Sequence, residues 1–226
     1  MAAPENRPHR ISIVIPVYQG EQTLAALVKE IALLAVPTLT AEGHEFQVIE
    51  LLLVNDHGPD RSDEVIRELA AAHDFIRPVW LSRNFGQHPA TLAGMASSSG
   101  DWIVTMDEDG QHDPAEIGDF LDVALARGSQ LVYAAPVNRP PHNMLRNGSS
   151  RLVKWFFSTF LTGGTEDTFQ SYRMVLGEIG RSVPASAGSG FYPDVALGWA
   201  PWPPAACPAR RMCKASVEGG EVGSAG

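Results

Sequence analysis

The chain has 226 residues, of which 44% are hydrophobic and 19% charged, the balance of a folded protein and not of a disordered one. Its 26 acidic residues against 17 Lys and Arg give a formal net charge of −9. This charge argues against a protein that coats nucleic acid, because such binding depends on basic side chains that neutralise phosphates. It still allows a small anionic ligand, because carboxylates can recruit a divalent cation that meets phosphate.

Strand and helix patterns alternate along the chain. Continuous apolar or β-branched runs predict five strands, at residues 11–15, 46–54, 77–82, 102–106 and 130–134. Apolar residues at helical spacing predict four helices, at residues 21–34, 62–72, 88–97 and 115–127. Asp113 is placed as the N-cap of the last helix, with Pro114 at its first position. The alternation predicts an α/β fold with a mostly parallel, twisted sheet that helices cover on both faces.

Polar segments follow four of the predicted strands, at residues 16–18, 55–56, 82–84 and 107–109. Ligands bind outside the carboxyl ends of the strands in such sheets, so these segments are expected to converge on one edge. Asp107 and Asp109 are spaced i, i+2 directly after a strand and can therefore share one hard cation. Because Mg²⁺ completes its shell with water and substrate phosphate oxygens, the pattern indicates a diphosphate ligand.

Composition changes in the second half of the chain. Residues 101–122 hold eight carboxylates and residues 123–165 hold none, although the latter carry basic side chains and an aromatic run. We expect residues 139–161 to contact a membrane surface peripherally, the alternative being a helix packed on the sheet with its arginines solvated. Residues 200–226 are rich in proline and then glycine without periodicity, and are expected to have no stable fold of their own.

The N-terminus and the cysteines indicate a cellular location. Residues 1–10 are polar and no apolar signal-peptide core follows them, and no apolar run approaches the roughly 20 residues of a spanning helix. Cys207 and Cys213 are too few for a disulfide framework and are expected to be reduced thiols. These features predict a cytoplasmic protein, either soluble or peripheral at the inner face of the membrane.

Four motifs occur in a fixed order along the chain. They are residues 13–18 (IVIPVY) with Glu21, 53–58 (LVNDHG), 81–86 (LSRNFG) and 105–114 (TMDEDGQHDP). The series resembles the family 2 glycosyltransferases of the GT-A fold, in particular the branch that transfers a sugar from a nucleotide donor to a polyprenyl phosphate. The resemblance covers about residues 10–199 and implies a catalytic domain there, with an N-terminal extension at 1–9 and a diverged tail at 200–226. It also implies inversion at the sugar.

The resemblance implies a role for individual residues. The donor-binding residues before the acidic motif would be Pro16, Val17, Tyr18, Glu21, Asp56, Arg83 and Asn84. Asp107 and Asp109 would hold Mg²⁺ or Mn²⁺, with Glu108 beside the donor and Gln111 beside the sugar or acceptor. Positions near the acceptor phosphate would be Tyr133, Arg139 and the segment 171–173, in which Arg173 is the candidate catalytic cation. The chain departs from the family pattern at Asn55, His57 and Pro59.

The implied reaction transfers a sugar from a UDP- or GDP-linked donor to an acceptor, with a nucleoside diphosphate as leaving group. A phosphate acceptor is ionised near pH 7 and needs no strong general base, in keeping with a sequence that shows no catalytic triad. Glycoside hydrolysis is disfavoured, because carboxylates at i, i+2 are neighbours on one cation and do not flank a scissile bond. Two alternatives stay open: a truncated or diverged protein that binds nucleotide-sugar without turnover, and a nucleotidyltransferase, for which no Gly-rich phosphate loop is present.

Overall fold

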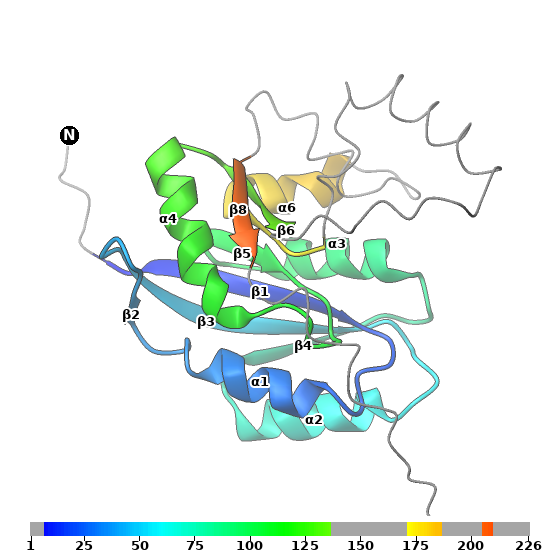
Figure 1. The fold of residues 1–226 in the computed structure, drawn as a ribbon. Helices are drawn as coiled ribbons and strands as arrows, with labels where there is room; N and C mark the ends of the chain where they lie inside the picture. Colours follow the sequence, from blue (N-terminus) through cyan, green and yellow to red (C-terminus); the bar gives the residue numbers. More distant parts are fainter. Residues whose placement is uncertain (1–6, 137–170, 187–204, 210–226) are drawn as a thin grey trace, which may run out of the picture.

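The computed structural model describes residues 7–136, 171–186 and 205–209 (Figure 1). The strands are β1 (His9–Val17), β2 (Thr38–Leu39), β3 (Glu45–Asn55), β4 (Ile76–Trp80), β5 (Trp102–Thr105), β6 (Leu131–Pro136), β7 (Arg173–Leu176) and β8 (Ala205–Ala209). The helices are α1 (Leu24–Ala32), α2 (Ser62–Ala72), α3 (Gln87–Ser97), α4 (Ile117–Arg127) and α6 (Gly177–Ser186), and a 3₁₀ turn spans Pro114–Glu116. None of these helices combines the length and the apolar character that crossing a bilayer requires.

The strands form one sheet in the order β2-β3-β1-β5-β7-β6-β8, and β4 also pairs with β3. Strands β4, β3, β1 and β5 are parallel, as the sequence predicts, so their carboxyl ends meet at one edge. Beyond β5 the sheet contains a strand, β7, that the sequence did not predict. Strand β7 enters between β5 and β6 and runs antiparallel to both, so the sheet is mixed. Its residues Arg173–Val175 are buried, which shows that the insertion completes the centre of the sheet.

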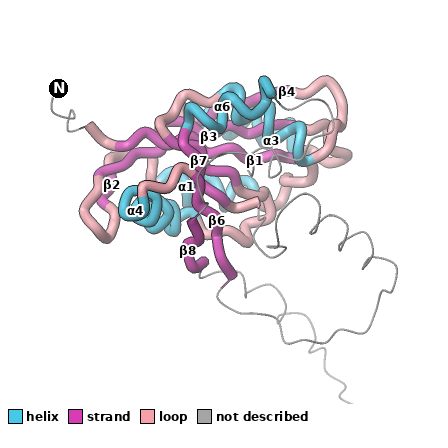
Figure 2. Tube along the Cα trace, turned by 90° about the horizontal axis from the view of Figure 1, so that it is seen from above, coloured by secondary structure: helices cyan, strands magenta, loops and turns pink. Residues whose placement is uncertain are grey.

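Alternate residues of the central strands serve two separate cores, one on each face of the sheet. Ile13 and Leu53 belong to the core that includes buried residues of α1, α2 and α4. Val14 and Val54 belong to the core that includes residues of α3 and α6. Helices α3 and α6 lie side by side over one face (Figures 1 and 2), and Figure 1 shows α1 and α2 together on the other. The prediction of helices on both faces is therefore confirmed, and the strands are apolar throughout because both of their faces are buried.

Local signals located most elements correctly. The predicted helix 62–72 is α2 with the same bounds. The helix predicted from residue 115 starts as the 3₁₀ turn and continues as α4, and the Asp113 side chain accepts a hydrogen bond from the Ala115 N–H, which confirms the cap. Residues 205–209 lie in the segment expected to lack a stable fold of its own, yet they form β8 against β6, where buried Cys207 forms no disulfide with any described residue. These five residues are ordered by the edge of β6, which supplies their hydrogen-bond partners, and the expectation that the tail has no fold of its own stays a prediction. Residues 210–226, Cys213 among them, and the segment 139–161 lie outside the described residues.

Candidate active site

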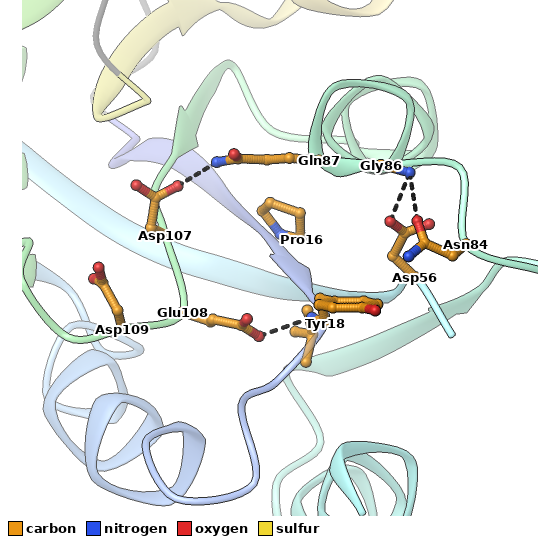
Figure 3. A pocket seen from close by; sticks show the side chains of 10 residues that line it. Pro16, Tyr18, Asp56, Asn84, Gly86, Gln87, Asp107, Glu108 and Asp109 are labelled. Carbon is orange, nitrogen blue, oxygen red and sulfur yellow. Dashed lines mark hydrogen bonds between the residues drawn. The ribbon is translucent and has the colours of Figure 1, made fainter. Parts of the chain in front are cut away.

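A cavity of about 420 Å³ opens at the carboxyl ends of β1, β3 and β5, beside the N-terminus of α3 (Figure 3). Its lining residues are Pro16, Val17, Tyr18, Asp56, Asn84, Gly86, Gln87, Asp107, Glu108 and Asp109. The predicted convergence of the four polar segments is confirmed, since each contributes to this lining. The sheet topology explains it, because β1 lies between β3 and β5 and all three strands end on the same side.

Asp107 lies just past the end of β5 with both of its carboxylate oxygens hydrogen-bonded. Oδ1 accepts a bond from Gln87 Nε2 at 2.6 Å, and Oδ2 accepts one from Ser171 Oγ at 2.5 Å. The Asp107 N–H donates to Nδ1 of His112 at 3.1 Å. His112 is buried and its ring stacks on Tyr172 with centroids 4.7 Å apart. Asp107 is thus fixed through its side chain and its backbone.

Asp109 stands on the same side of the cavity and is exposed, with Oδ1 accepting a hydrogen bond from the Gln111 N–H at 3.0 Å. Glu108, between the two, turns the other way and accepts bonds from the N–H groups of Tyr18 and Gln19, each at 2.9 Å. Burial raises the pKa of Glu108, and the charges of Asp60 and Asp107 add to this, against the lowering effect of the two N–H groups. Glu108 therefore joins the acidic loop to the end of β1.

The donor set at this end of the cavity fits a hard divalent cation. Asp107 and Asp109 offer carboxylate oxygens, the ligand type that Mg²⁺ and Mn²⁺ prefer. Among the residues that the structure describes, no group of three or more His, Cys, Asp or Glu could hold an ion alone. An ion at this place would complete its shell with water and ligand phosphate oxygens, which is how Mg²⁺ usually binds at phosphate sites.

At the other end of the cavity, buried Asp56 holds the loop between β4 and α3. Its Oδ1 accepts a hydrogen bond from the Phe85 N–H at 2.7 Å, and its Oδ2 accepts one from the Gly86 N–H at 2.8 Å (Figure 3). The Asn84 side chain also accepts from Gly86, at 2.9 Å. Gly86 has φ of +94°, a conformation that favours glycine. The ring of Tyr18, 41% exposed, stands at the rim as an open aromatic face.

Glu21 lies outside the cavity lining and connects two loops. Its N–H donates to Asp60 Oδ2 at 3.1 Å, and its Oε2 accepts a bond from the Arg61 N–H at 3.2 Å. Two of the three residues that depart from the family pattern, Asn55 and His57, contact each other in the same loop. Asn55 Oδ1 accepts the His57 N–H at 2.7 Å, which holds His57 at a positive φ of 59°. The predicted contact of Glu21 with a ligand stays a prediction.

A second cavity of about 240 Å³ adjoins the first and shares Pro16, Gln87 and Asp107 with it. Its other lining residues are His88, Thr91, Thr105, Met106, Ser171 and Arg173. Arg173 is buried, and burial lowers its pKa, against the raising effect of Tyr133 and Asp107. A guanidinium keeps its charge under these conditions. The second cavity therefore contains a buried cation on the far side of Asp107.

Besides Glu21, three more of the predicted site residues are not found in either cavity lining. The Arg83 guanidinium stacks on the Phe85 ring at 4.7 Å and is outside both linings, and Gln111 is exposed beyond the Asp109 turn. Arg139 lies outside the described residues. Sequence reasoning missed Gln87 and assigned no separate role to Ser171. Gln87 directly follows the motif at 81–86, and its position before a helix was the available signal. No local signal connects Ser171 with Asp107, which is 64 residues away.

The chain was compared with known proteins. The model of the family named Glycosyl transferase family 2 matches residues 12–178. An undecaprenyl-phosphate 4-deoxy-4-formamido-L-arabinose transferase of Yersinia pestis is 37% identical over 147 residues, which are 64% of this chain and 42% of that protein. The transferase of the same name from Pectobacterium carotovorum is 37% identical over 130 residues, which are 57% of this chain and 37% of the relative. The chain thus spans less than half the length of these relatives.

Solved structures show the same fold. Glucosyl-3-phosphoglycerate synthase from Mycobacterium tuberculosis, in complex with Mn²⁺, UDP-glucose and phosphoglyceric acid, superposes with a TM-score of 0.51 at 21% identity. The match covers 76% of this chain and 57% of that one. The predicted GT-A type of α/β fold is thereby confirmed. With a family match that extends over most of the described sheet, the chain belongs to glycosyl transferase family 2.

Proposed function

We propose that this protein transfers a sugar from a nucleoside-diphosphate donor to a polyprenyl phosphate. The observation that carries the proposal is one cavity with an aromatic ring and a buried carboxylate at one end and the Asp107–Asp109 pair at the other. A nucleotide-sugar has the matching polarity, with a flat base at one end and a diphosphate at the other. The names of the Yersinia and Pectobacterium relatives state an undecaprenyl-phosphate acceptor, which supports the acceptor class.

The nucleoside is proposed to lie at the end of β1. Tyr18 would offer its ring face to the base, with Pro16 and Val17 below, and Asn84 would contact the donor beside Asp56. Asp56 binds two N–H groups and so fixes the shape of the loop that closes this end, and each of its oxygens keeps a lone pair that could accept a hydrogen bond from the base or ribose. The donor is proposed to be UDP- or GDP-linked. The Mycobacterium synthase, which has the same fold, was solved with UDP-glucose.

Asp107 and Asp109 are proposed to hold Mg²⁺ or Mn²⁺ against the diphosphate. When bound there, such an ion supplies positive charge where the leaving diphosphate develops negative charge. Asp107 is the better-fixed ligand, because both of its oxygens are already oriented by hydrogen bonds. Asp109 is exposed and free to follow the ligand from the turn at Gly110.

In the reaction, an oxygen of the acceptor phosphate forms a new bond to the anomeric carbon. The bond from that carbon to the diphosphate oxygen breaks, and its electron pair leaves with the nucleoside diphosphate. Attack opposite the leaving group gives inversion. The acceptor phosphate is proposed to enter the second cavity, where the Arg173 fork matches its charge and shape. Because the phosphate is already an anion, no general base is required.

The polyprenyl chain of such an acceptor resides in a membrane, so we propose that the protein works peripherally, at the cytoplasmic face. Residues 139–161, basic and aromatic in sequence, are the proposed contact, and Arg139 a proposed second partner of the acceptor. Gln111, whose N–H donates to Asp109, is proposed to lie beside the sugar or acceptor. The protein would thus bind a soluble donor in the first cavity and the phosphate of a lipid acceptor in the second, on opposite sides of Asp107.

The test measures product formation from a panel of UDP- and GDP-sugars with undecaprenyl phosphate, with Mn²⁺ or with EDTA. Asp107→Ala and Asp109→Ala should abolish metal-dependent transfer and leave the melting temperature near that of the unaltered protein. Asp74→Ala removes an exposed carboxylate away from both cavities and is the matched control. Transfer retained by both cavity variants contradicts the proposal.

Two other outcomes would support one of the two alternative functions that the sequence leaves open. Nucleotide binding without product for every donor and acceptor pair would indicate a binding protein without turnover. Release of diphosphate from a nucleoside triphosphate would indicate a nucleotidyltransferase. Binding is read independently by thermal shift, because a nucleotide at 100 times its Kd stabilises the native state by about 2.7 kcal/mol. For a chain of this size that corresponds to roughly 5–10 °C.

A further inference from the structure

We propose that Gln87 and Ser171 are positioning residues that hold the Asp107 carboxylate in its metal-binding orientation and thereby set the affinity for the divalent cation. This inference rests on the proposed function, and it assigns roles to two residues outside the acidic motif. Neither residue needs to touch the ion. They restrict the orientations of the Asp107 carboxylate, which binds the ion.

Gln87 and Ser171 hold the Asp107 carboxylate from two sides, and we call this pair the clamp. Gln87 Nε2 donates to Oδ1 at 2.6 Å and Ser171 Oγ donates to Oδ2 at 2.5 Å, so rotation of the carboxylate would break both bonds. An ionised carboxylate has about four lone-pair sites, so each oxygen keeps one for a cation after accepting one hydrogen bond. Partners of this kind orient metal ligands in proteins, and losing one typically costs 10- to 100-fold in metal affinity.

Each half of the clamp is itself fixed. Gln87 is the first residue of α3, and its carbonyl accepts a bond from Thr91 Oγ1 at 2.9 Å. It also directly follows Gly86, whose N–H is held by buried Asp56 at 2.8 Å. The short segment 85–87 therefore connects the nucleoside end of the cavity with the metal end. These contacts fix the backbone from which the exposed Gln87 side chain reaches Asp107.

On the other side, Ser171 lies two residues before the start of β7, and its carbonyl accepts a bond from Thr105 Oγ1 at 2.6 Å. The next residue, Tyr172, donates through its hydroxyl to the carbonyl of Asp113 at 2.6 Å and stacks on His112. Ser171 and Tyr172, just before β7, thus contact the acidic loop at Asp107, His112 and Asp113. The contact from Ser171 is the one made to a candidate metal ligand. Asp109 accepts its hydrogen bond from the backbone of its own turn, and no side chain among the described residues supports it in the same way.

The test measures Mn²⁺ affinity from the electron paramagnetic resonance signal of free Mn²⁺, with UDP present, using the full chain. Gln87→Ala and Ser171→Ala should each weaken Mn²⁺ binding about 10- to 100-fold. Ser171→Thr keeps a hydroxyl at the same atom and should restore the affinity. Ser97→Ala is the matched control, because it removes a hydroxyl from the far end of α3 that only bonds to Ala93 within the helix. UDP affinity in EDTA and the melting temperature are measured for every variant.

A positioning role predicts loss of Mn²⁺ affinity with UDP affinity in EDTA unchanged. If Gln87→Ala and Ser171→Ala bind Mn²⁺ as tightly as the unaltered protein, the clamp is refuted while the proposed function stands. A loss of Mn²⁺ affinity that comes with a similar loss of UDP affinity in EDTA and with a lower melting temperature also refutes it, since that pattern indicates a general loss of structure. If the unaltered protein binds neither Mn²⁺ nor UDP or GDP, the proposed function fails, and the inference with it.

Discussion

Replacing Gly58 by alanine should separate the two loops that form the nucleoside end of the cavity. A Cβ atom built on Gly58 would lie 1.5 Å from the carbonyl oxygen of Tyr18 and 2.6 Å from its carbonyl carbon. Ordinary contacts of a Cβ begin at 3.4 Å, so the loops would have to move apart by about 2 Å. Both contacting atoms of Tyr18 belong to the backbone, so no side-chain rotation can relieve the overlap.

The cost follows from the hydrogen bonds that cross between these loops. They are Asp56 N–H to the Val17 carbonyl at 2.8 Å, Gly20 N–H to Ser62 Oγ at 2.8 Å, Glu21 N–H to Asp60 Oδ2 at 3.1 Å, and Arg61 N–H to Glu21 Oε2 at 3.2 Å. At about 1 kcal/mol each, loss of two to four of them lowers the free energy of unfolding by about 2–4 kcal/mol. The melting temperature should then fall by roughly 5–15 °C.

The assay is thermal unfolding followed by circular dichroism, together with calorimetric titration of UDP and GDP. Gly118→Ala is the matched control, because its Cβ would meet the Phe46 ring at an ordinary 3.5 Å inside α4. That change should leave stability equal or raise it by about 0.5–1 kcal/mol, the usual gain of alanine over glycine in a helix. If Gly58→Ala melts and binds nucleotide like the unaltered protein, the close packing of the two loops is not a constraint and the reasoning is wrong.

Two further outcomes are expected. Burial by itself would raise the pKa of Glu50, but hydrogen bonds from Ser12, Arg77 and Ser99 outweigh it and hold the pKa below its ordinary value of 4.5. The stability that this carboxylate contributes is therefore present above pH 4.5 and lost as the pH falls below it. Glu50→Gln should lower the free energy of unfolding at pH 7 by about 2–3 kcal/mol, and urea unfolding of this variant should depend less on pH in the acid range. A dependence on acid pH identical to that of the unaltered protein would contradict this. Tyr18→Ala should weaken nucleotide binding by roughly 5- to 150-fold, which is the contribution of stacking one base on an aromatic ring. Tyr18→Phe should bind with nearly the affinity of the unaltered protein, and neither variant should change the melting temperature. An unchanged affinity in the alanine variant would show that the ring does not contact the nucleotide.

Several features of this protein follow from local sequence. The continuous apolar runs of β1 and β3 indicate strands buried on both faces, and the parallel arrangement places their polar ends at one edge. Helix α2 and the Asp113 cap depend on neighbours within a few residues, so periodicity and capping preferences suffice to predict them. The position of the acidic pair, directly after a strand, was enough to place it in the cavity.

Other features were decided by tertiary structure. Glu108 sits between two candidate metal ligands in sequence, yet it accepts hydrogen bonds from the N–H groups of Tyr18 and Gln19, just past the end of β1. Asp56 is a candidate ligand-binding residue by motif, and the Phe85 and Gly86 N–H groups engage its carboxylate.

The insertion of β7 beside β5, and with it the bond from Ser171 to Asp107, joins segments 64 residues apart. Hydrophobic periodicity reports which face of an element is buried, but it carries no information on which distant segment covers that face. The partners of a polar side chain are likewise set by what the completed fold brings within hydrogen-bond distance. The sequence by itself therefore determined the strands, the helices and the edge where the site forms, and the tertiary structure decided which side chains at that edge remain available to a ligand.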